Sequence, residues 1–512
     1  MSAIPRLLRS ALRTASLPRR AQRIRSTTLA AAALSLLLPF SRAATAPAPT
    51  AAAPTAAPLD LGTRWELFVD EFLVAAKSGA ALRLHAPVRR EIVLTTDQPW
   101  EGPTSAYFSV IQDGPKVRLY YRGSAGGSDH SAAQVTCVAE SSDGIHFTRP
   151  RVGLIAVNGS TDNNVVWRGV ESHNFAPFLD PNPAAPPDQR YKALGGIKEK
   201  GTNWHQGATP GGLYAFASAD GLVWRKLRPE PVMTKGAFDS QNLALWDAPR
   251  DRYLCFSRIF AGGVRAIQSS ASTDFLGWGE PALHRYAADA PVEHFYTSAT
   301  IACPTAPHLF LSFPKRYLPK RTKVPGHPGG PGASDAVFMS SRDGVTWDRP
   351  FLEAWVRPGP DLKNWTDRNN MTACGLYDAG DGEWSLYISE HYRHADHRIR
   401  RLTVRSQGFA SMHAGARGGE FTTPPLVFAG SRLRLNYATS AAGSLRIEIQ
   451  DAATGRPLPG FALADMPELF GDELAAVATW KKGPDLAALR GRPVRLRVQL
   501  KDADLYALRF AD

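Results

Sequence analysis

SSDGIHFTRP (residues 141–150) follows a strand-like run of apolar residues, and related stretches occur three more times. They are SADGLVWRKL (218–227), STDFLGWGEP (272–281) and SSRDGVTWDRP (340–350). All four fit the pattern Ser-x-Asp-Gly-x-x-aromatic, except that the third copy has Phe275 where the others have glycine. An Asp-Gly pair is typical of tight hairpin turns because glycine accepts a positive φ angle. We therefore interpret the repeat as a structural turn and not as a set of catalytic aspartates.

The spacing of the turns predicts the architecture. Their aspartates, Asp143, Asp220, Asp274 and Asp343, are 77, 54 and 69 residues apart, which is irregular for a solenoid but compatible with propeller blades. Short strand-like runs precede each turn, and a fifth set without the turn follows. The sequence therefore predicts a five-bladed β-propeller over residues 59–412. The early run WELFVDEFLV (65–74) is predicted to complete the last blade and close the ring.

The pattern of apolar and charged residues changes after Gly418. Runs such as RLRLNYATS and PVRLRVQL alternate apolar with charged residues, as strands with one wet face do. Residues 418–512 are therefore predicted to form a β-sandwich, with a short helix at 472–477 as the best helical candidate. The predicted class is all-β, a five-bladed β-propeller followed by a C-terminal β-sandwich.

The first 44 residues are predicted to be an export signal. Eight arginines lie before Ala44, and an apolar run (29–40) is followed by small residues. That run is shorter than the roughly 20 residues of a membrane-spanning helix, so stable membrane insertion after cleavage is not expected. Arg19-Arg20 is a feature of twin-arginine export, and the sequence leaves the route to the periplasm or the exterior open. The Pro/Ala/Thr-rich stretch 45–58 is predicted to be a linker.

Charge and cysteine content narrow the function classes. The 512-residue chain has a formal net charge of +13, which falls to +5 once the eight signal arginines are removed. The remaining basic residues form no stripe, so a nucleic-acid partner is not expected. The four cysteines lie in separate strand-like runs without metal spacing, and we expect free thiols: Cys137, Cys255, Cys303 and Cys374.

At this point the sequence resembles a known family. The segments that carry the resemblance are LFVDEFLV (67–74), PWEG (99–102), VTCVAESSDGIHFTRP (135–150), SHNFAPFLD (172–180), KGAFDSQNLALWD (235–247) and DADLYALRF (502–510). They resemble exported bacterial glycoside-hydrolase-like proteins, which are similar to the five-bladed propellers of glycoside hydrolase families 32 and 43. The C-terminal part is similar to the family 32 sandwich. The family 32 catalytic signatures are absent, however, so catalytic residues must be argued from position.

Glycoside hydrolysis usually requires two carboxyl groups, and in such propellers the innermost strand of each blade begins beside the central funnel. Four acids precede predicted first strands: Glu101, Asp239, Glu293 and Asp367. We assign Glu293 as general acid and Asp239 as base or nucleophile. Glu101, or alternatively Asp70 on the predicted closing strand, would tune the pKa of the pair or orient the sugar. Each of these acids has a structural alternative, in which it bonds nearby backbone at the start of a strand.

Polar neighbours of these acids are predicted to contact the sugar. They are His173, Asn174, Gln241, Asn242, His294 and Glu390. The alternative role of His173 and Asn174 is to fix the start of a blade. The long basic loop 314–334 would contact an acidic sugar, uronic or sulfated, or else be a solvated surface loop. No cofactor and no metal are predicted, because the spacing of His391, His394 and His397 matches no zinc motif.

The function predicted from the sequence is that of an exported glycoside hydrolase acting on an oligo- or polysaccharide. The alternative is a carbohydrate-binding propeller without catalysis. The sugar, the linkage, the stereochemical outcome and the oligomeric state are left open by the sequence.

Overall fold

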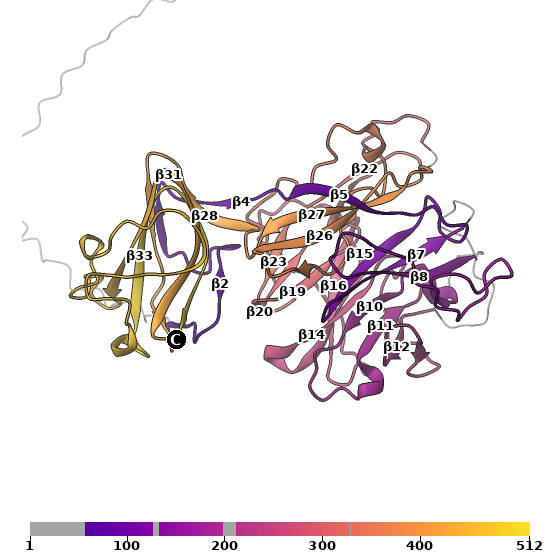
Figure 1. Ribbon diagram of the computed structural model, residues 1–512, viewed down its shortest axis with the longest axis horizontal. Helices are drawn as coiled ribbons and strands as arrows, with labels where there is room; N and C mark the ends of the chain where they lie inside the picture. Colours follow the sequence, from indigo (N-terminus) through magenta and orange to yellow (C-terminus); the bar gives the residue numbers. More distant parts are fainter. Residues whose placement is uncertain (1–56, 126–132, 198–210, 328) are drawn as a thin grey trace, which may run out of the picture. The chain divides into compact units, whose positions relative to one another are not determined.

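The computed structural model describes residues 57–125, 133–197, 211–327 and 329–512, which form β-strands joined by loops and short 3-10 helices (Figure 1). The all-β class is therefore confirmed. The predicted export signal (1–44) and nearly all of the predicted linker (45–58) lie outside the described residues. Within the described residues, no helix has the length and apolarity needed to cross a membrane.

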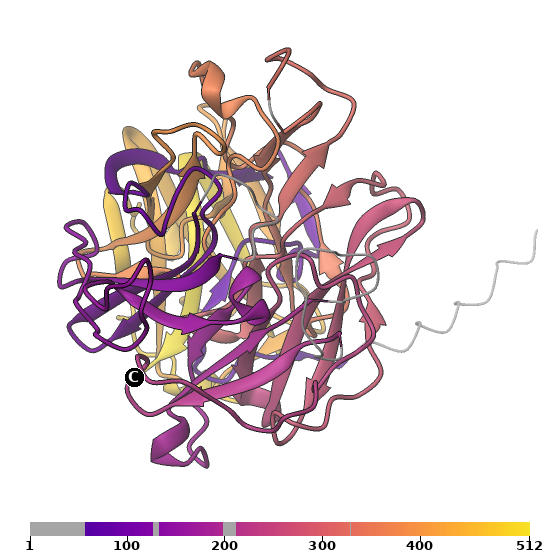
Figure 2. The same cartoon turned by 90° about the vertical axis from the view of Figure 1, so that its right-hand side faces the viewer.

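Five four-stranded sheets follow one another along the chain (Figures 1 and 2). The first contains β6 (Ala106–Asp113), β7 (Lys116–Ser124), β8 (Gln134–Ser141) and β9 (Val165–Arg168). The second contains β10 (Ala176–Leu179), β11 (Tyr191–Gly195), β12 (Tyr214–Ser218) and β13 (Arg225–Lys226). The third contains β14 (Leu243–Asp247), β15 (Arg252–Ala261), β16 (Val264–Ser272) and β17 (Ala282–Leu283).

The last two of these sheets have more complicated chain paths. The fourth contains β19 (Thr300–Cys303), β20 (Ala306–Ser312), β23 (Met339–Ser341) and β24 (Trp347–Asp348). A small side sheet is inserted in it, made of β18 (His294–Phe295), β21 (Lys315–Leu318) and β22 (Ala333–Ala336). The fifth contains β25 (Tyr377–Asp378), β26 (Glu383–Glu390), β27 (Arg398–Arg405) and β5 (Val88–Thr95). The 3-10 helices are η1 (Val170–His173), η2 (Pro187–Gln189), η3 (Ala248–Arg250), η4 (Leu362–Asn364), η5 (Leu463–Asp465) and η6 (Ala487–Leu489).

The repeated Ser-x-Asp-Gly turn has the local role that the sequence predicts. In the first copy, the Ser141 hydroxyl accepts a bond from the Gly144 N–H at 3.0 Å, and Asp143 accepts from the backbone N–H of residues 145 and 146. The other three copies repeat these bonds. In the third copy Phe275 adopts φ 68°, close to the 69° of Gly144. The serine and aspartate bonds therefore hold a left-handed residue even where it is not glycine.

The segment that completes the fifth sheet is not the one predicted. Residues 65–74 were expected to do so, but β5 pairs with β27 instead, and β2 (Glu66–Leu67) pairs with β33 (Val494–Ala511). The reason is burial: Phe68 and Val69 are both fully buried, whereas residues 88 and 90–92 of β5 are exposed. A segment with exposed positions suits the outer edge of a sheet, which contacts solvent.

The C-terminal strands form a ten-stranded sheet that also recruits the start of the described chain. Its strands are β1 (Leu59–Asp60), β2, β3 (Ala76–Ser78), β4 (Ala81–Leu84), β28 (Ala410–Ala414), β29 (Gly419–Thr422), β30 (Leu426–Val427), β31 (Arg432–Asp451), β32 (Asp472–Val477) and β33. Residues 59–84 and 410–412, which the sequence placed in the propeller, thus pair with C-terminal strands. The helix expected at 472–477 is strand β32, because pairing with β31 overrides its local preference.

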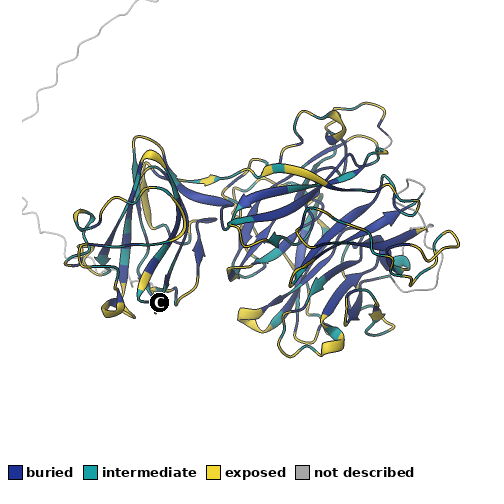
Figure 3. Ribbon diagram, viewed as in Figure 1, coloured by how far each residue is buried: buried dark blue, intermediate teal, exposed yellow. Residues whose placement is uncertain are grey.

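Burial follows the sheets. The strands of the four-stranded sheets are mostly buried, and exposed residues concentrate in the connecting loops (Figure 3). The ten-stranded sheet has its own apolar core around Leu435, Ile447 and Leu496. As expected, all four cysteines are free thiols.

Candidate active site

A basic residue occupies a similar position near the end of the second strand in four of the five sheets. Arg122 lies in β7 and Arg258 in β15, while Lys315 and Arg393 each lie three residues beyond the ends of β20 and β26. Three tyrosines from the starts of the sheets and their connections join them in one buried group: Tyr107, Tyr296 and Tyr392. Cations from separate sheets therefore meet aromatic rings in one place.

Tyr296 lies among four cations. Its ring centroid is 3.9 Å from Nζ of Lys315 and 5.1, 5.5 and 5.7 Å from the guanidinium carbons of Arg258, Arg265 and Arg368. We call the following residues the Tyr296 cluster: Tyr107, Arg122, His173, Asp239, Arg258, Arg265, Tyr296, Lys315, Asp367, Arg368, Tyr392 and Arg393.

The backbone of the cluster is unusual. Tyr107, Arg368 and Arg393 have φ angles of 58°, 61° and 67°, in the left-handed region that non-glycine residues rarely adopt. Such conformations cost of order 1–3 kcal/mol each and concentrate at functional sites. The strain supports a functional assignment for this cluster.

Asp239 is the ionised carboxylate of the cluster. Its Oδ1 lies 2.8 Å from Nε2 of His173, and its Oδ2 lies 3.7 Å from the Arg258 guanidinium. Burial raises the pKa of Asp239, but the His173 hydrogen bond and the charges of His173, Arg258 and Arg122 outweigh it and lower the pKa to about 2. Because its side chain is still 43% exposed, this carboxylate can contact a ligand.

Asp367 has the opposite electrostatic balance. Its side chain is only 6% exposed, and its two oxygens lie 3.5 Å from Arg393 and Arg368. Burial raises the pKa of Asp367, and the charges of Arg393 and Lys315 offset only part of that effect. Asp367 therefore holds a proton more readily than an ordinary aspartate.

Lys315 is the most deeply buried cation of the cluster. It is 0% exposed, and its ammonium has no hydrogen-bond partner among the described residues. Burial lowers the pKa of Lys315 to about 7, with the Asp367 carboxylate opposing the shift and nearby arginines adding to it. Lys315 is thus close to losing its proton at neutral pH.

His173 is the second predicted site residue that the structure brings to the cluster. Besides Asp239, it contacts Gln134 and Arg122 through Nδ1, at 3.0 and 3.2 Å. Its ring packs edge-on against Tyr107. His173 is therefore held from both ring nitrogens and orients the Asp239 carboxylate.

Glu293, which the sequence paired with Asp239, has other partners. Its two oxygens lie 3.0 and 2.5 Å from Arg316 and Arg349, so arginines occupy both. It lines a cavity of about 580 Å³ together with Asp335 and Trp365. The neighbouring His294 accepts a bond from the backbone N–H of Arg265.

Two other predicted acids are parts of buried ion pairs. Glu101 is 0% exposed and accepts bonds from Arg149 and the Tyr121 hydroxyl. Asp70 bonds Arg342, which also holds Glu66. Asp70 is therefore not an axial acid of a closing strand, since its segment joins the ten-stranded sheet and its carboxylate is engaged by the turn of the fourth sheet.

Three predicted sugar-binding residues donate their amide N–H groups to other protein groups, mostly backbone carbonyls. Asn174 is fully buried and donates to the carbonyls of residues 196, 238 and 240. Asn242 donates to two of the same carbonyls. Gln241 donates to the Phe108 carbonyl and the Ser109 hydroxyl. Asn174 thus has the alternative role, fixing the start of a sheet.

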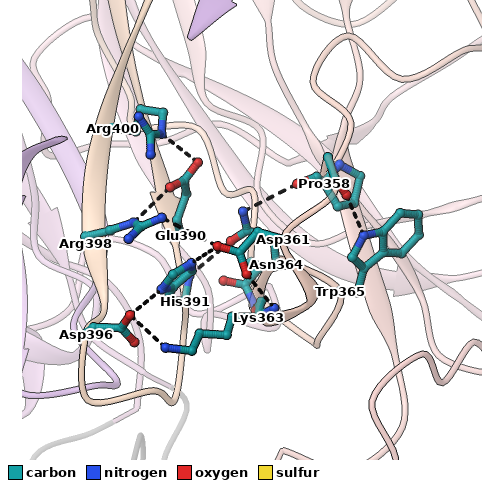
Figure 4. Close-up of polar contacts among 12 residues, drawn as sticks. Pro358, Asp361, Lys363, Asn364, Trp365, Glu390, His391, Asp396, Arg398 and Arg400 are labelled. Carbon is teal, nitrogen blue, oxygen red and sulfur yellow. Dashed lines mark hydrogen bonds and ion pairs between the residues drawn. The ribbon is translucent and has the colours of Figure 1, made fainter. Parts of the chain in front are cut away.

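Glu390 lies in a neighbouring network of charges (Figure 4). It is 1% exposed, and its oxygens accept from Arg398 at 3.0 Å and from Arg400 at 2.9 Å. Beside it, His391 bridges Asp361 and Asp396 at 2.7 and 2.9 Å (Figure 4). Glu390 is therefore satisfied by protein groups. Among the described residues, no group of His, Cys, Asp and Glu side chains is arranged to hold a metal ion.

Most of the cluster's cations and tyrosines were missed from the sequence. The available signal was a basic residue near the end of the second strand in four of the five sheets, in LYYRG, CFSRIF, SFPKR and SEHYR. The sequence places Asp367 before the fifth sheet but predicts no role for it, because nothing local distinguishes it from other acids at the start of a strand. Its environment comes from the loop around Gly329 and from Arg393.

Comparison with known proteins finds no matching family model and no matching curated protein. Solved structures do match. A glycoside hydrolase has 13% identity over 62% of this chain and 92% of its own, with a TM-score of 0.42. An N-acetylgalactosamine deacetylase from F. plautii, in complex with blood group B trisaccharide, has 13% identity over 65% and 97%, with a TM-score of 0.43.

A third solved structure belongs to a study of the GH130 family of mannoside phosphorylases and glycoside hydrolases, at 13% identity over 63% and 94% of the two chains and a TM-score of 0.39. All three TM-scores are below 0.5, so the likeness identifies neither a family nor a function for this chain.

Proposed function

We propose that the protein is an exported glycoside hydrolase whose active site is the Tyr296 cluster. The observation that carries the proposal is the pair Asp239 and Asp367, whose pKa values are displaced in opposite directions within one cluster. Two carboxyl groups with separated proton affinities are what acid–base cleavage of a glycosidic bond requires.

The proposal includes a five-bladed propeller built from the four-stranded sheets, with the ten-stranded sheet as a β-sandwich. Hydrogen bonds between successive sheets support it, because they also join the fifth sheet back to the first. They are Tyr120 to Gly221, Asn174 to Phe238, Arg252 to Asp343, Cys374 to Thr300 and Val110 to Cys374. In such a ring the starts of the inner strands, where Tyr107, Asp239 and Tyr296 lie, face a common funnel.

In the mechanism that we propose, Asp367 is the general acid. It gives its proton to the leaving glycosidic oxygen, and burial keeps that proton on the carboxyl group until then. Asp239 is ionised and acts on the anomeric carbon or on a water molecule, while His173 holds its orientation. The faces of Tyr107 and Tyr296 offer the apolar surface on which a sugar ring can stack.

The sequence alone favours Glu293 as general acid. Both Glu293 oxygens accept arginine hydrogen bonds, at 3.0 and 2.5 Å, whereas the Asp367 oxygens lie 3.5 Å from their arginines. Asp367 is therefore favoured, because a proton donor needs an oxygen free to reach the substrate. The two assignments are distinguished by Glu293→Gln and Asp367→Asn, tested side by side.

The test is a screen of plant and algal glycans with the mature protein and three variants. Asp239→Asn and Asp367→Asn should each lose turnover by about 10²–10⁴-fold. The control Asp381→Asn changes an exposed turn aspartate and should retain it. Sugar release that survives Asp239→Asn would overturn the proposal. Binding of a glycan by the unmodified protein without release would favour the alternative, a carbohydrate-binding propeller.

A further inference from the structure

Basic side chains outnumber acidic ones among the described residues of the Tyr296 cluster. The basic ones are Arg122, Arg258, Arg265, Lys315, Arg368 and Arg393, of which Arg368 and Arg393 take part in further interactions, and the acidic ones are Asp239 and Asp367. Like charges brought together in a partly buried site repel one another unless anions compensate them. Lys315 and Arg265, whose buried Nζ and Nε have no hydrogen-bond partner among the described residues, therefore need their own explanation.

Lys315 is the clearest example of a basic group without a compensating partner among the described residues. Its ammonium group has three N–H donors and is completely buried, yet it has no acceptor among the described residues. Its Nζ lies 3.9 Å from the centroid of the Tyr296 ring, and Asp367 acts on it through its charge without a hydrogen bond. Buried charged groups are normally paired, so an unpartnered lysine marks a place for an absent anion.

Arginine guanidinium groups lie around the same Tyr296 ring, beside Lys315. Arg265 stacks over Tyr296 and Tyr317 at 5.5 and 5.1 Å, and its Nε is also buried without a partner. Arg368, in the loop before the fifth sheet, lies 5.7 Å from the ring centroid. Planar guanidinium groups bind carboxylate and sulfate oxygens through paired N–H donors. The ring, the lysine and the arginines together match an anionic group attached to a sugar.

We propose that the substrate of the Tyr296 cluster is an acidic glycan, whose carboxylate or sulfate group binds Lys315 and the arginines beside it. This inference rests on the proposed function, since it takes the ligand to be a carbohydrate. A uronic acid and a sulfated sugar share the chemistry that the cluster recognises. The lowered pKa of Lys315 is consistent with a site completed by an anion.

The test measures binding to the mature full-length protein by calorimetry. The probes are oligogalacturonate, its methyl-esterified neutral form, a sulfated galactan oligosaccharide with its desulfated form, and inorganic sulfate. One acidic oligosaccharide should bind at least about tenfold more tightly than its neutral form, as expected for a hydrogen bond between charged groups.

Lys315→Met should abolish that preference, with Lys482→Met, an exposed lysine of the C-terminal part, as the matched control. Arg265→Gln is a second variant in case Lys315→Met fails to fold, and it should reduce the preference in the same way. Equal affinity for acidic and neutral forms would overturn the inference. Inorganic sulfate that binds as tightly as the acidic oligosaccharide would also overturn it, because the site would then hold a free anion.

The result is separable from that of the proposed function. An acidic glycan that binds but is not cleaved would leave this inference standing and would remove the hydrolase proposal. A neutral glycan that is cleaved at Asp239 would support the hydrolase and remove the inference.

Discussion

Asp239 and Asp367 carry the same functional group but lie in opposite electrostatic surroundings. Asp239 receives a hydrogen bond from His173 and remains partly exposed, whereas Asp367 is enclosed and meets its arginines at longer distance. The difference between the two residues lies in their partners and not in their chemistry. In the proposed mechanism, this difference gives each carboxyl group a distinct part in acid–base catalysis.

The pH dependence of the rate should report both groups. Activity requires Asp239 ionised, so it is lost at low pH as the pH falls through the lowered pKa of about 2. It requires Asp367 protonated, so it is lost as the pH rises through a pKa above the usual aspartate value. His173→Asn should move only the acid limb of kcat/KM, upward, because it removes the hydrogen bond that lowers the pKa of Asp239. A shift confined to the alkaline limb would contradict the assignment of His173.

Lys315 should take up a proton when an acidic glycan binds. Asp367 and the basic groups Arg258, Arg265 and Arg393 act on its pKa, which is about 7 in the free protein, and a bound anion would raise it. Binding above pH 7 should therefore weaken as the pH rises. Calorimetry in buffers of different ionisation enthalpy measures the uptake, and Lys315→Met should eliminate it. No difference between buffers at pH 8 would contradict the account.

At the scale of the element, the Ser-x-Asp-Gly turn fixes the outer hairpin of a sheet and also contacts the neighbouring sheet. The Gly144 carbonyl accepts a bond from the Tyr387 hydroxyl of β26, and the Gly221 carbonyl accepts one from Tyr120 of β7. The turn therefore cannot change shape without disturbing two sheets. The aspartates of the turns accept hydrogen bonds from backbone N–H groups, which agrees with the structural interpretation of the repeat.

Two glycine variants test this role. A Cβ at Gly144 would meet the ring of Tyr377 and the hydroxyl of Tyr387, whereas at Gly114, which also has positive φ, it would meet nothing within 4 Å. Gly114→Ala should lower the free energy of unfolding by about 1–2 kcal/mol, because alanine is disfavoured in the left-handed backbone region. Gly144→Ala should cost about 1–3 kcal/mol more, because of overpacking. Urea denaturation of both variants measures the difference, and equal losses would contradict the contact with the fifth sheet.

At the scale of the whole molecule, a buried ionic network connects the start of the described chain with the fourth sheet. Arg342, in the turn of that sheet, bonds Glu66 and Asp70, and Glu66 also lies 3.0 Å from His308. Burial raises the pKa of Glu66, but these partners lower it to about 2. The stability that Glu66 contributes is therefore present above pH 4.5 and is lost as the pH falls toward 2.

Removing Arg342 should leave the buried Asp70 carboxylate without its partner, while Glu66 keeps Arg64 and His308. Arg342→Met should lower the free energy of unfolding by about 3–5 kcal/mol, as for other buried ion pairs deprived of one member. Urea denaturation near pH 7 measures the loss, with the exposed Lys482→Met as the control. A loss as small as that of the control would mean that the network contributes nothing to holding these segments together.

Much of this organisation could be predicted from the sequence, because it rests on local patterns. The turns follow from Ser, Asp and Gly at fixed spacing, and the sheets follow from the strand-like runs between them. The pairing of β2 with β33 and of β4 with β28 could not be predicted, because the partners lie far apart in the chain, as in residue 66 with 508 and residue 84 with 410. Short strands such as β2 carry too little pattern to specify a partner.

The candidate site was predictable only in part. Asp239 and His173 were identified because polar residues directly before an inner strand stand out. Glu293 has the same local sequence pattern as Asp239. Its environment differs only because Arg316 and Arg349, which are distant in sequence, form ion pairs with it. Asp367 and Lys315 depend on burial, which no short sequence pattern reports.

The central claim is that Asp239 and Asp367 act together on a glycosidic bond. The measurement that tests it most directly is kcat/KM on the preferred glycan for the mature protein, Asp239→Asn and Asp367→Asn, with glycan affinity measured alongside. The account predicts a loss of about 10²–10⁴-fold in each variant with the affinity largely retained. Turnover by either variant at the level of the unmodified protein would contradict it.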